Sequence, residues 1–316
     1  MWQHRMNFWT LTIKIIFLSQ TTTGILGNFS LLFYYIFHCG EFISKPTELI
    51  LMHLMAANAL TILSVGVPHT IAVFGLKQFL SDFGCRLLLY IQRVGRSVSI
   101  STTCILSVFQ AMTISHTQFL CKESRDKAPK YIGFSIALLW IFYVLIHFIY
   151  IVYLFVKGNS KNVTRKRDFG YCSIVGEGEI SDSLYAATVV CPEILFSLVM
   201  SWSSGSMIVI LYSHKQRVQH IHSTHVSRRI SPESRAIQSI LVLVLIFLAF
   251  YTVSSILQGC IALLNNHSWW QVNITHFASL GFPSFAPLVV MKHYCRVHRL
   301  NLVRIRNINL SPHLFI

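Results

Sequence analysis

Three arginines stand in an otherwise apolar stretch of the chain, at positions Arg86, Arg93 and Arg96. Spacings of seven and three residues place them on one side of a helix, with Arg93 and Arg96 about 12–17 Å below Cys85. An arginine near the middle of a bilayer costs about 2.5–3.5 kcal/mol on insertion scales, so it should face the protein interior or water. Because a guanidinium stays protonated, it needs an anion or a polar cavity there.

One carboxylate is the candidate partner of these arginines. Glu193 follows Pro192 in a second apolar stretch, at a similar depth. We hypothesise that Glu193 pairs with Arg93 or Arg96, and that a ligand competes for or completes this network. Gln92, which precedes Arg93, is included as a candidate ligand contact. The alternative is a permanent ion pair that only fixes the register of two helices.

The sequence carries no enzyme motif: HExxH, GxSxG and the Walker A loop are all missing. The eight cysteines form no CxxC pair and show no Cys/His spacing typical of zinc, so neither a metal nor another cofactor is expected. The formal net charge of +15 comes from short basic segments between apolar runs. Such segments determine topology and contact lipid headgroups, which argues against nucleic acid as a partner.

The elements that position these residues are membrane helices. Of the 316 residues 53% are hydrophobic and 12% charged, whereas a soluble domain carries roughly twice that charged fraction. A helix of about 20 apolar residues spans the bilayer core. The sequence predicts an all-α, seven-helix membrane domain over residues 1–316, with spans at about 12–37, 48–74, 84–114, 131–156, 184–213, 236–264 and 272–291.

The distribution of basic residues predicts an N-terminus outside and a C-terminus in the cytosol. In that orientation the inner segments hold fifteen Lys and Arg and the outer segments eight, which follows the positive-inside rule. Arg5 and Lys14, which precede the first span, argue the reverse, but the sum over all segments outweighs them. Inside the spans, Asn58 and Gln110 are interpreted as hydrogen-bond partners between helices, and His69 and His147 as partnered side chains.

The polar loop at 157–183 carries two features of an external segment. Asn162 begins an Asn-Val-Thr sequon, which can be glycosylated only on the external side. Cys172 lies in the same loop, and Cys85 opens the third span. Both cysteines would face the oxidising side, where a disulfide persists. A Cys85–Cys172 disulfide is therefore predicted, with two free thiols as the alternative.

Several strings resemble one receptor family over residues of about 20–292. They include Lys45-Pro46-Thr47-Glu48-Leu49, Arg93-Val94-Gly95-Arg96-Ser97, Ser107-Val108-Phe109-Gln110-Ala111 and Gly170-Tyr171-Cys172-Ser173. They are similar to the vomeronasal type-1 receptors, which are G-protein-coupled pheromone receptors. A bitter-taste-like receptor is a weaker match. A transporter is disfavoured because seven spans do not divide into two equal repeats.

This resemblance implies a multi-pass receptor of the plasma membrane that binds a small chemosignal and activates a heterotrimeric G protein of the inhibitory class. It also implies the Cys85–Cys172 disulfide and a glycan at Asn162. The G-protein-facing candidates are Gln110, Lys215, Arg217, Arg228 and Arg229. The four basic residues are equally explained as topology determinants. Phe109-Gln110-Ala111 stands where rhodopsin-like receptors carry Asp-Arg-Tyr, so their activation switch cannot be transferred.

Overall fold

The protein folds into a bundle of long helices with one short hairpin. This computed structural model describes residues 2–37, 46–76, 78–115, 122–158, 165–168, 171–176, 191–221, 232–263 and 269–309. The helices are α1 (Trp2–Phe37), α3 (Pro46–Thr61), the π-helical turn η1 (Ile62–Gly66), α4 (Val67–Val73), α5 (Asp82–Ser115), α6 (Lys122–Gly158), α8 (Cys191–Ile221), α9 (Pro232–Leu263) and α10 (Trp269–Asn309).

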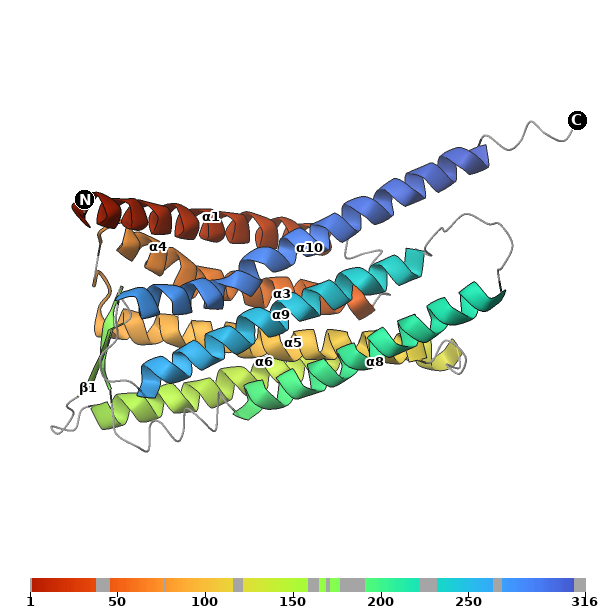
Figure 1. The fold of residues 1–316 in the computed structure, drawn as a ribbon. Helices are drawn as coiled ribbons and strands as arrows, with labels where there is room; N and C mark the ends of the chain where they lie inside the picture. Colours follow the sequence, from red (N-terminus) through yellow and green to blue (C-terminus); the bar gives the residue numbers. More distant parts are fainter. Residues whose placement is uncertain are drawn as a thin grey trace, which may run out of the picture.

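Consecutive long helices run in alternating directions along the bundle (Figure 1). α3, η1 and α4 follow one another directly and together form one element of span length. The N-terminus lies at the same end as the β1–β2 hairpin, and the C-terminus lies at the opposite end (Figure 1). α5 occupies the interior, because it contacts α3, α6, α8 and α9.

Six helices in the described part of the chain are long and apolar enough to cross a membrane. They contain the segments Trp9–Phe37, Pro46–Val73, Lys130–Ile149, Cys191–Ile210, Leu241–Gln258 and Trp269–Lys292. The third predicted span corresponds to α5, which is 34 residues long but more polar. Its arginines, serines and threonines lower its hydropathy, and helices rather than lipid surround most of it. Apolar character alone therefore supports six spans rather than seven.

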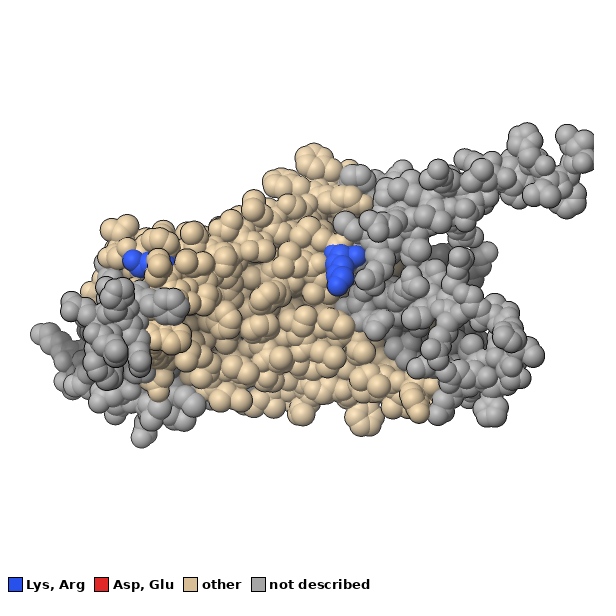
Figure 2. All heavy atoms as spheres, turned by 45° about the horizontal axis from the view of Figure 1, so that its top comes forward, with Lys and Arg blue, Asp and Glu red and all other residues tan. Residues whose placement is uncertain are grey.

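The surface of the bundle carries an uncharged belt. On the face shown in Figure 2, Lys and Arg atoms appear toward the two ends of the described surface, and a broad band between them holds no charged side chain. Beneath this belt, Leu54, Ile100, Phe247 and Phe282 form part of one buried apolar core, contributed by α3, α5, α9 and α10. Apolar side chains thus face both lipid and core, as expected of a multi-pass membrane protein.

The structure differs from the predicted elements in two respects. α1 begins at Trp2 and α10 continues to Asn309, beyond the apolar limits of the first and last spans. The described part of α8 begins at Cys191, so the predicted span residues 184–190 lie outside the described residues and stay a prediction. Strands β1 (Arg165–Asp168) and β2 (Ser173–Gly176) pair antiparallel in the loop that was predicted without strands. Neither strand shows the alternating apolar pattern that would have indicated it.

Gly95 allows α5 to approach α3 closely. A Cβ at this position would lie 2.8 Å from Thr61 Oγ1 and 3.0 Å from the Ala57 carbonyl oxygen. We expect Gly95→Ala to destabilise the bundle by about 1–3 kcal/mol, because the two helices must separate to admit the methyl group. The change would appear as a lower melting temperature of the purified protein in detergent.

Gly205 on α8 provides the matched control for this prediction. A Cβ at Gly205 would meet nothing within 4 Å, so Gly205→Ala should leave the melting temperature unchanged or raise it slightly. Equal melting temperatures for the Gly95→Ala and Gly205→Ala variants would contradict the close approach of α3 and α5.

Candidate functional site

Arg96 and Glu193 form an ion pair inside the bundle. Arg96 is 6% exposed and Glu193 7% exposed. Arg96 Nε donates to Glu193 Oε1, and Nη2 donates to Oε2 at 3.2 Å. Two parallel hydrogen bonds match the planar guanidinium to the carboxylate and fix their relative orientation. The structure thus forms the ion pair predicted for Glu193, with Arg96 as its partner.

Helix α9 completes the surroundings of this pair. Arg96 Nη1 donates to Ser254 Oγ at 2.9 Å, and Nη2 donates to Ser255 Oγ at 2.8 Å. Ser255 Oγ in turn donates to Glu193 Oε2. The Tyr251 ring lies 4.6 Å from Arg96 Cζ, in cation–π geometry. Burial of two charges is tolerated only when such hydrogen bonds replace water, and here they do.

The same network reaches α10. Ser254 and Ser279 hydroxyl oxygens lie 2.7 Å apart, and Gln258 Nε2 donates to Ser279 Oγ at 3.1 Å. We call the set Arg96, Glu193, Tyr251, Ser254, Ser255, Gln258 and Ser279 the charged network. It joins α5, α8, α9 and α10 through polar side chains. A shift of any one of these helices therefore changes the hydrogen bonds that it shares with its neighbours in the network.

The local sequence explains where the members of the charged network sit. Glu193 follows Pro192 near the start of the described part of α8. Tyr251, Ser254, Ser255 and Gln258 follow the spacing i, i+3, i+4, i+7, which places them on one face of α9. Sequence reasoning missed these α9 residues, although this periodicity could have revealed them.

The other predicted ligand contacts lie on α5 near Arg96. Arg93 is half-buried about one turn earlier in the helix, and Gln92 is also half-buried. Arg86 is half-buried near the start of α5. Among the residues that the structure describes, no three His, Cys, Asp or Glu side chains gather where they could hold a metal ion.

The residues predicted to face a G protein fall mostly outside the described part. Gln110 is 8% exposed and lies 14 residues after Arg96, which is about 21 Å along α5. Lys215 and Arg217 lie in α8, and the structure describes their backbone but not their side chains. Arg228, Arg229 and the sequon residue Asn162 also lie outside the described residues.

Among the polar residues predicted to be partnered inside the spans, Asn58, His69 and His147 have partners. Ser99 Oγ donates to Asn58 Oδ1 at 2.9 Å, which links α5 to α3. His147 Nε2 lies 2.9 Å from Ser97 Oγ, which links α6 to α5. These bonds satisfy polar groups that lipid could not, so they support the packing of the bundle.

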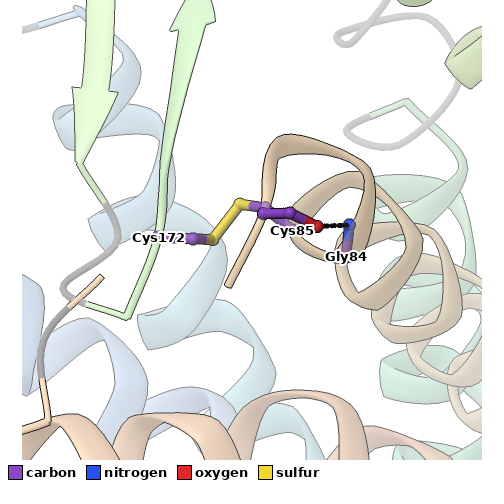
Figure 3. Close-up of a disulfide and its surroundings, with 4 residues drawn as sticks. Gly84, Cys85 and Cys172 are labelled. Atoms are coloured by element: carbon purple, nitrogen blue, oxygen red, sulfur yellow. Dashed lines mark hydrogen bonds between the residues drawn. A yellow bond between two sulfur atoms is a disulfide. The ribbon is translucent and has the colours of Figure 1, made fainter. Parts of the chain in front are cut away.

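A disulfide joins Cys85, at the start of α5, to Cys172, between the two strands (Figure 3). Both cysteines are buried, and their Cα atoms are 5.8 Å apart. This confirms the predicted pairing and excludes the alternative of two free thiols. The bond fixes the hairpin over the end of the bundle at which the chain begins (Figure 1).

Tyr171, next to Cys172, begins a chain of ring contacts that connects the hairpin to three more helices. Its side chain is fully buried, and this burial raises the pKa of the phenol. The Tyr171 ring lies 6.0 Å from His276 of α10, whose ring lies 4.1 Å from His69 of α4. His69 in turn packs edge-on against Phe17 of α1 at 4.5 Å and lies 3.3 Å from Asn273 Oδ1 through Nε2. The hairpin is thus seated on α10 and α4, and His69 extends this packing to α1.

These observations define a multi-pass helical membrane protein with a buried charged network and a disulfide-held hairpin at one end of the bundle. Comparison with known proteins specifies the family. The model of the vomeronasal organ pheromone receptor family matches residues 11–302. The chain belongs to this family of vomeronasal type-1 receptors, so it is a receptor rather than an enzyme.

Individual relatives agree with this assignment. Human vomeronasal type-1 receptor 4 is 45% identical over 283 residues, which cover 89% of this chain and 94% of the relative. Human vomeronasal type-1 receptor 2 is 46% identical over 275 residues, with 87% and 70% covered. A more distant zebrafish (Danio rerio) relative, olfactory receptor class A-like protein 1, is 29% identical over 250 residues and 78% of each chain.

Proposed function

We propose that the protein crosses the bilayer seven times, with α5 as the crossing that apolar character alone misses. A helix of 34 residues is about 51 Å long, which exceeds the roughly 30 Å of a bilayer core. The alternating directions of its neighbours require α5 to run from one end of the bundle to the other (Figure 1). Its polar face is satisfied by the charged network, so lipid need not solvate it.

The N-terminal end of this bundle is the external end in the proposed topology. The Cys85–Cys172 disulfide lies there, and such bonds persist in an oxidising compartment. The excess of basic residues on the opposite side supports the same orientation. Asn162, in the loop between α6 and the hairpin, would then be accessible to glycosylation at the plasma membrane.

The function proposed within this frame is chemosensory reception coupled to a heterotrimeric G protein of the inhibitory class. The observation that carries it is the charged network, which joins four helices of a bundle belonging to a receptor family. A ligand can activate a receptor only by binding one packing of the helices better than another. A small chemosignal that changes the bonds of Arg96 or Glu193 from the outer half would meet this requirement.

Two different parts of α5 receive different roles in this proposal. Gln92, Arg93 and Arg96 would contact the chemosignal, and the guanidinium groups favour a sulfate, carboxylate or carbonyl on it. Gln110, further along the helix and buried in this packing, would belong to the end of α5 nearer the G protein. The basic residues Lys215, Arg217, Arg228 and Arg229 would add positive charge to that inner face.

Co-expression with a promiscuous G protein and calcium imaging against a ligand panel tests this function. The panel should pair each anionic steroid with its neutral parent, and we expect the anionic member to be more potent. Arg93→Gln should reduce the preference for the anionic steroid. The control is Trp202→Leu, which changes an exposed residue of α8 and should keep the response once it is normalised to surface abundance. Substrate-dependent uptake into vesicles without G protein, with no calcium response to any compound, would instead indicate a transporter.

A further inference from the structure

Three indole rings gather where α1 and α10 meet at the N-terminal end of the bundle. Trp9 and Trp270 have ring centroids 5.8 Å apart at 81°, and Trp269 and Trp270 have centroids 4.9 Å apart at 74°. Each side chain remains about half exposed, at 46%, 45% and 44% for Trp9, Trp269 and Trp270. Edge-to-face packing therefore leaves part of each indole exposed at one place on the surface. We call these residues the tryptophan cluster.

The depth of the tryptophan cluster places it at the membrane surface. Trp9 lies three residues before the predicted first span at 12–37, and Trp269 lies three residues before the predicted last span at 272–291. The contact between Trp9 and Trp270 brings the starts of these two spans to one level, near the boundary between hydrocarbon and headgroups. Tryptophan is enriched at that boundary because its ring is apolar and its N–H is polar. The exposed indole surfaces therefore meet lipid headgroups rather than acyl chains.

We propose that the tryptophan cluster binds the quaternary ammonium of a choline phospholipid headgroup. Indole is the strongest aromatic partner for cations, and several rings around one quaternary ammonium are a recurring recognition device. A quaternary ammonium has no N–H to donate, so hydroxyls and carbonyls compete poorly with indole faces for it. The primary ammonium of an ethanolamine headgroup is compact, strongly hydrated and satisfied by water. The proposed site therefore discriminates choline from ethanolamine lipids, and it is independent of chemosensory function.

Native mass spectrometry of the receptor with lipids of equal acyl chains tests the proposal. The purified protein receives equimolar palmitoyl-oleoyl phosphatidylcholine, phosphatidylethanolamine and phosphatidylglycerol, and the bound lipids are counted by mass. We expect about fivefold more phosphatidylcholine than phosphatidylethanolamine at the most retained position. Trp9→Leu/Trp270→Leu should abolish that preference, whereas Trp202→Leu, which removes an indole 80% exposed on α8, should preserve it.

A second experiment uses only the wild-type receptor and distinguishes a lipid headgroup from a free quaternary ammonium ion as the ligand of the tryptophan cluster. Tetramethylammonium chloride should displace phosphatidylcholine from the wild-type receptor, whereas the same concentration of sodium chloride should not. Equal retention of choline and ethanolamine lipids by the wild type would overturn the proposal. A dominant retention of phosphatidylglycerol would also overturn it, because it would show that the net positive charge selects the lipid. Tryptophan fluorescence gives a further check. If tetramethylammonium quenched this fluorescence and added phosphatidylcholine did not reverse the quenching, the proposed binding of a lipid headgroup would be refuted.

Discussion

Glu193→Leu is expected to lower the stability of the receptor by about 3–5 kcal/mol, because it leaves the Arg96 guanidinium buried without its anion. Arg96 is only 6% exposed, so water cannot replace the two hydrogen bonds that the carboxylate accepts. Ser254 and Ser255 would still accept hydrogen bonds, but a hydroxyl carries no charge to offset the cation. The measurement is the melting temperature in detergent, together with the amount of receptor at the cell surface.

Two further variants distinguish an unpaired charge from a general packing defect. Arg96→Met/Glu193→Leu removes both charges and should recover most of the lost stability, because apolar residues can replace a buried ion pair. Asp82→Asn removes an exposed carboxylate from the first turn of α5 and should change the melting temperature little. If the double variant were less stable than Glu193→Leu, the loss would not come from the unpaired arginine.

Cys172→Ser is expected to lower the stability by about 2–5 kcal/mol. The disulfide closes a segment of 87 residues, so its loss frees many conformations of the unfolded chain. It also holds Tyr171, whose contacts with His276 seat the hairpin on α10. The expected results are a lower melting temperature and reduced surface expression, with protease cleavage of the hairpin as a local readout.

The controls for the disulfide use the other cysteines near it. Cys85→Ser/Cys172→Ser should be no less stable than Cys172→Ser alone, because the two residues act through one bond. Cys191 is an exposed free thiol at the start of α8, and Cys191→Ser should behave as the wild type. A melting temperature that stayed unchanged in Cys172→Ser would show that packing alone holds the hairpin.

The extent to which sequence predicted this molecule depends on the kind of signal. Long apolar runs predicted the positions of the helices, because lipid forces each spanning backbone to satisfy its own hydrogen bonds. The mean hydropathy that identifies the other six helices does not identify α5, because α5 packs against protein and is more polar. The hairpin was missed because short strands in a polar loop carry no periodic pattern.

The candidate site was predicted only in part. The cost of burying Arg96 required a partner, and Glu193 was the only carboxylate in the apolar runs apart from Glu48 at the very start of the second, so one pair followed from charge alone. The choice between Arg93 and Arg96 did not follow, because both lie on the same side of α5. Ser254, Ser255 and Gln258 were missed because neutral polar residues are common in spans and gain meaning only when a charge faces them.

The sequence by itself determined the membrane helices, the need for a buried counter-ion and the family to which the chain belongs. Each of these depends on composition or on residues close together in the chain. The tertiary structure alone decided that Arg96 is the partner of Glu193, that α9 and α10 join the charged network, and that Tyr171 rests on His276. The pairs Arg96–Glu193, Arg96–Ser254 and Tyr171–His276 are 97, 158 and 105 positions apart in the chain. Which of these side chains meet depends on the rotation and depth of each helix, and local sequence does not specify either.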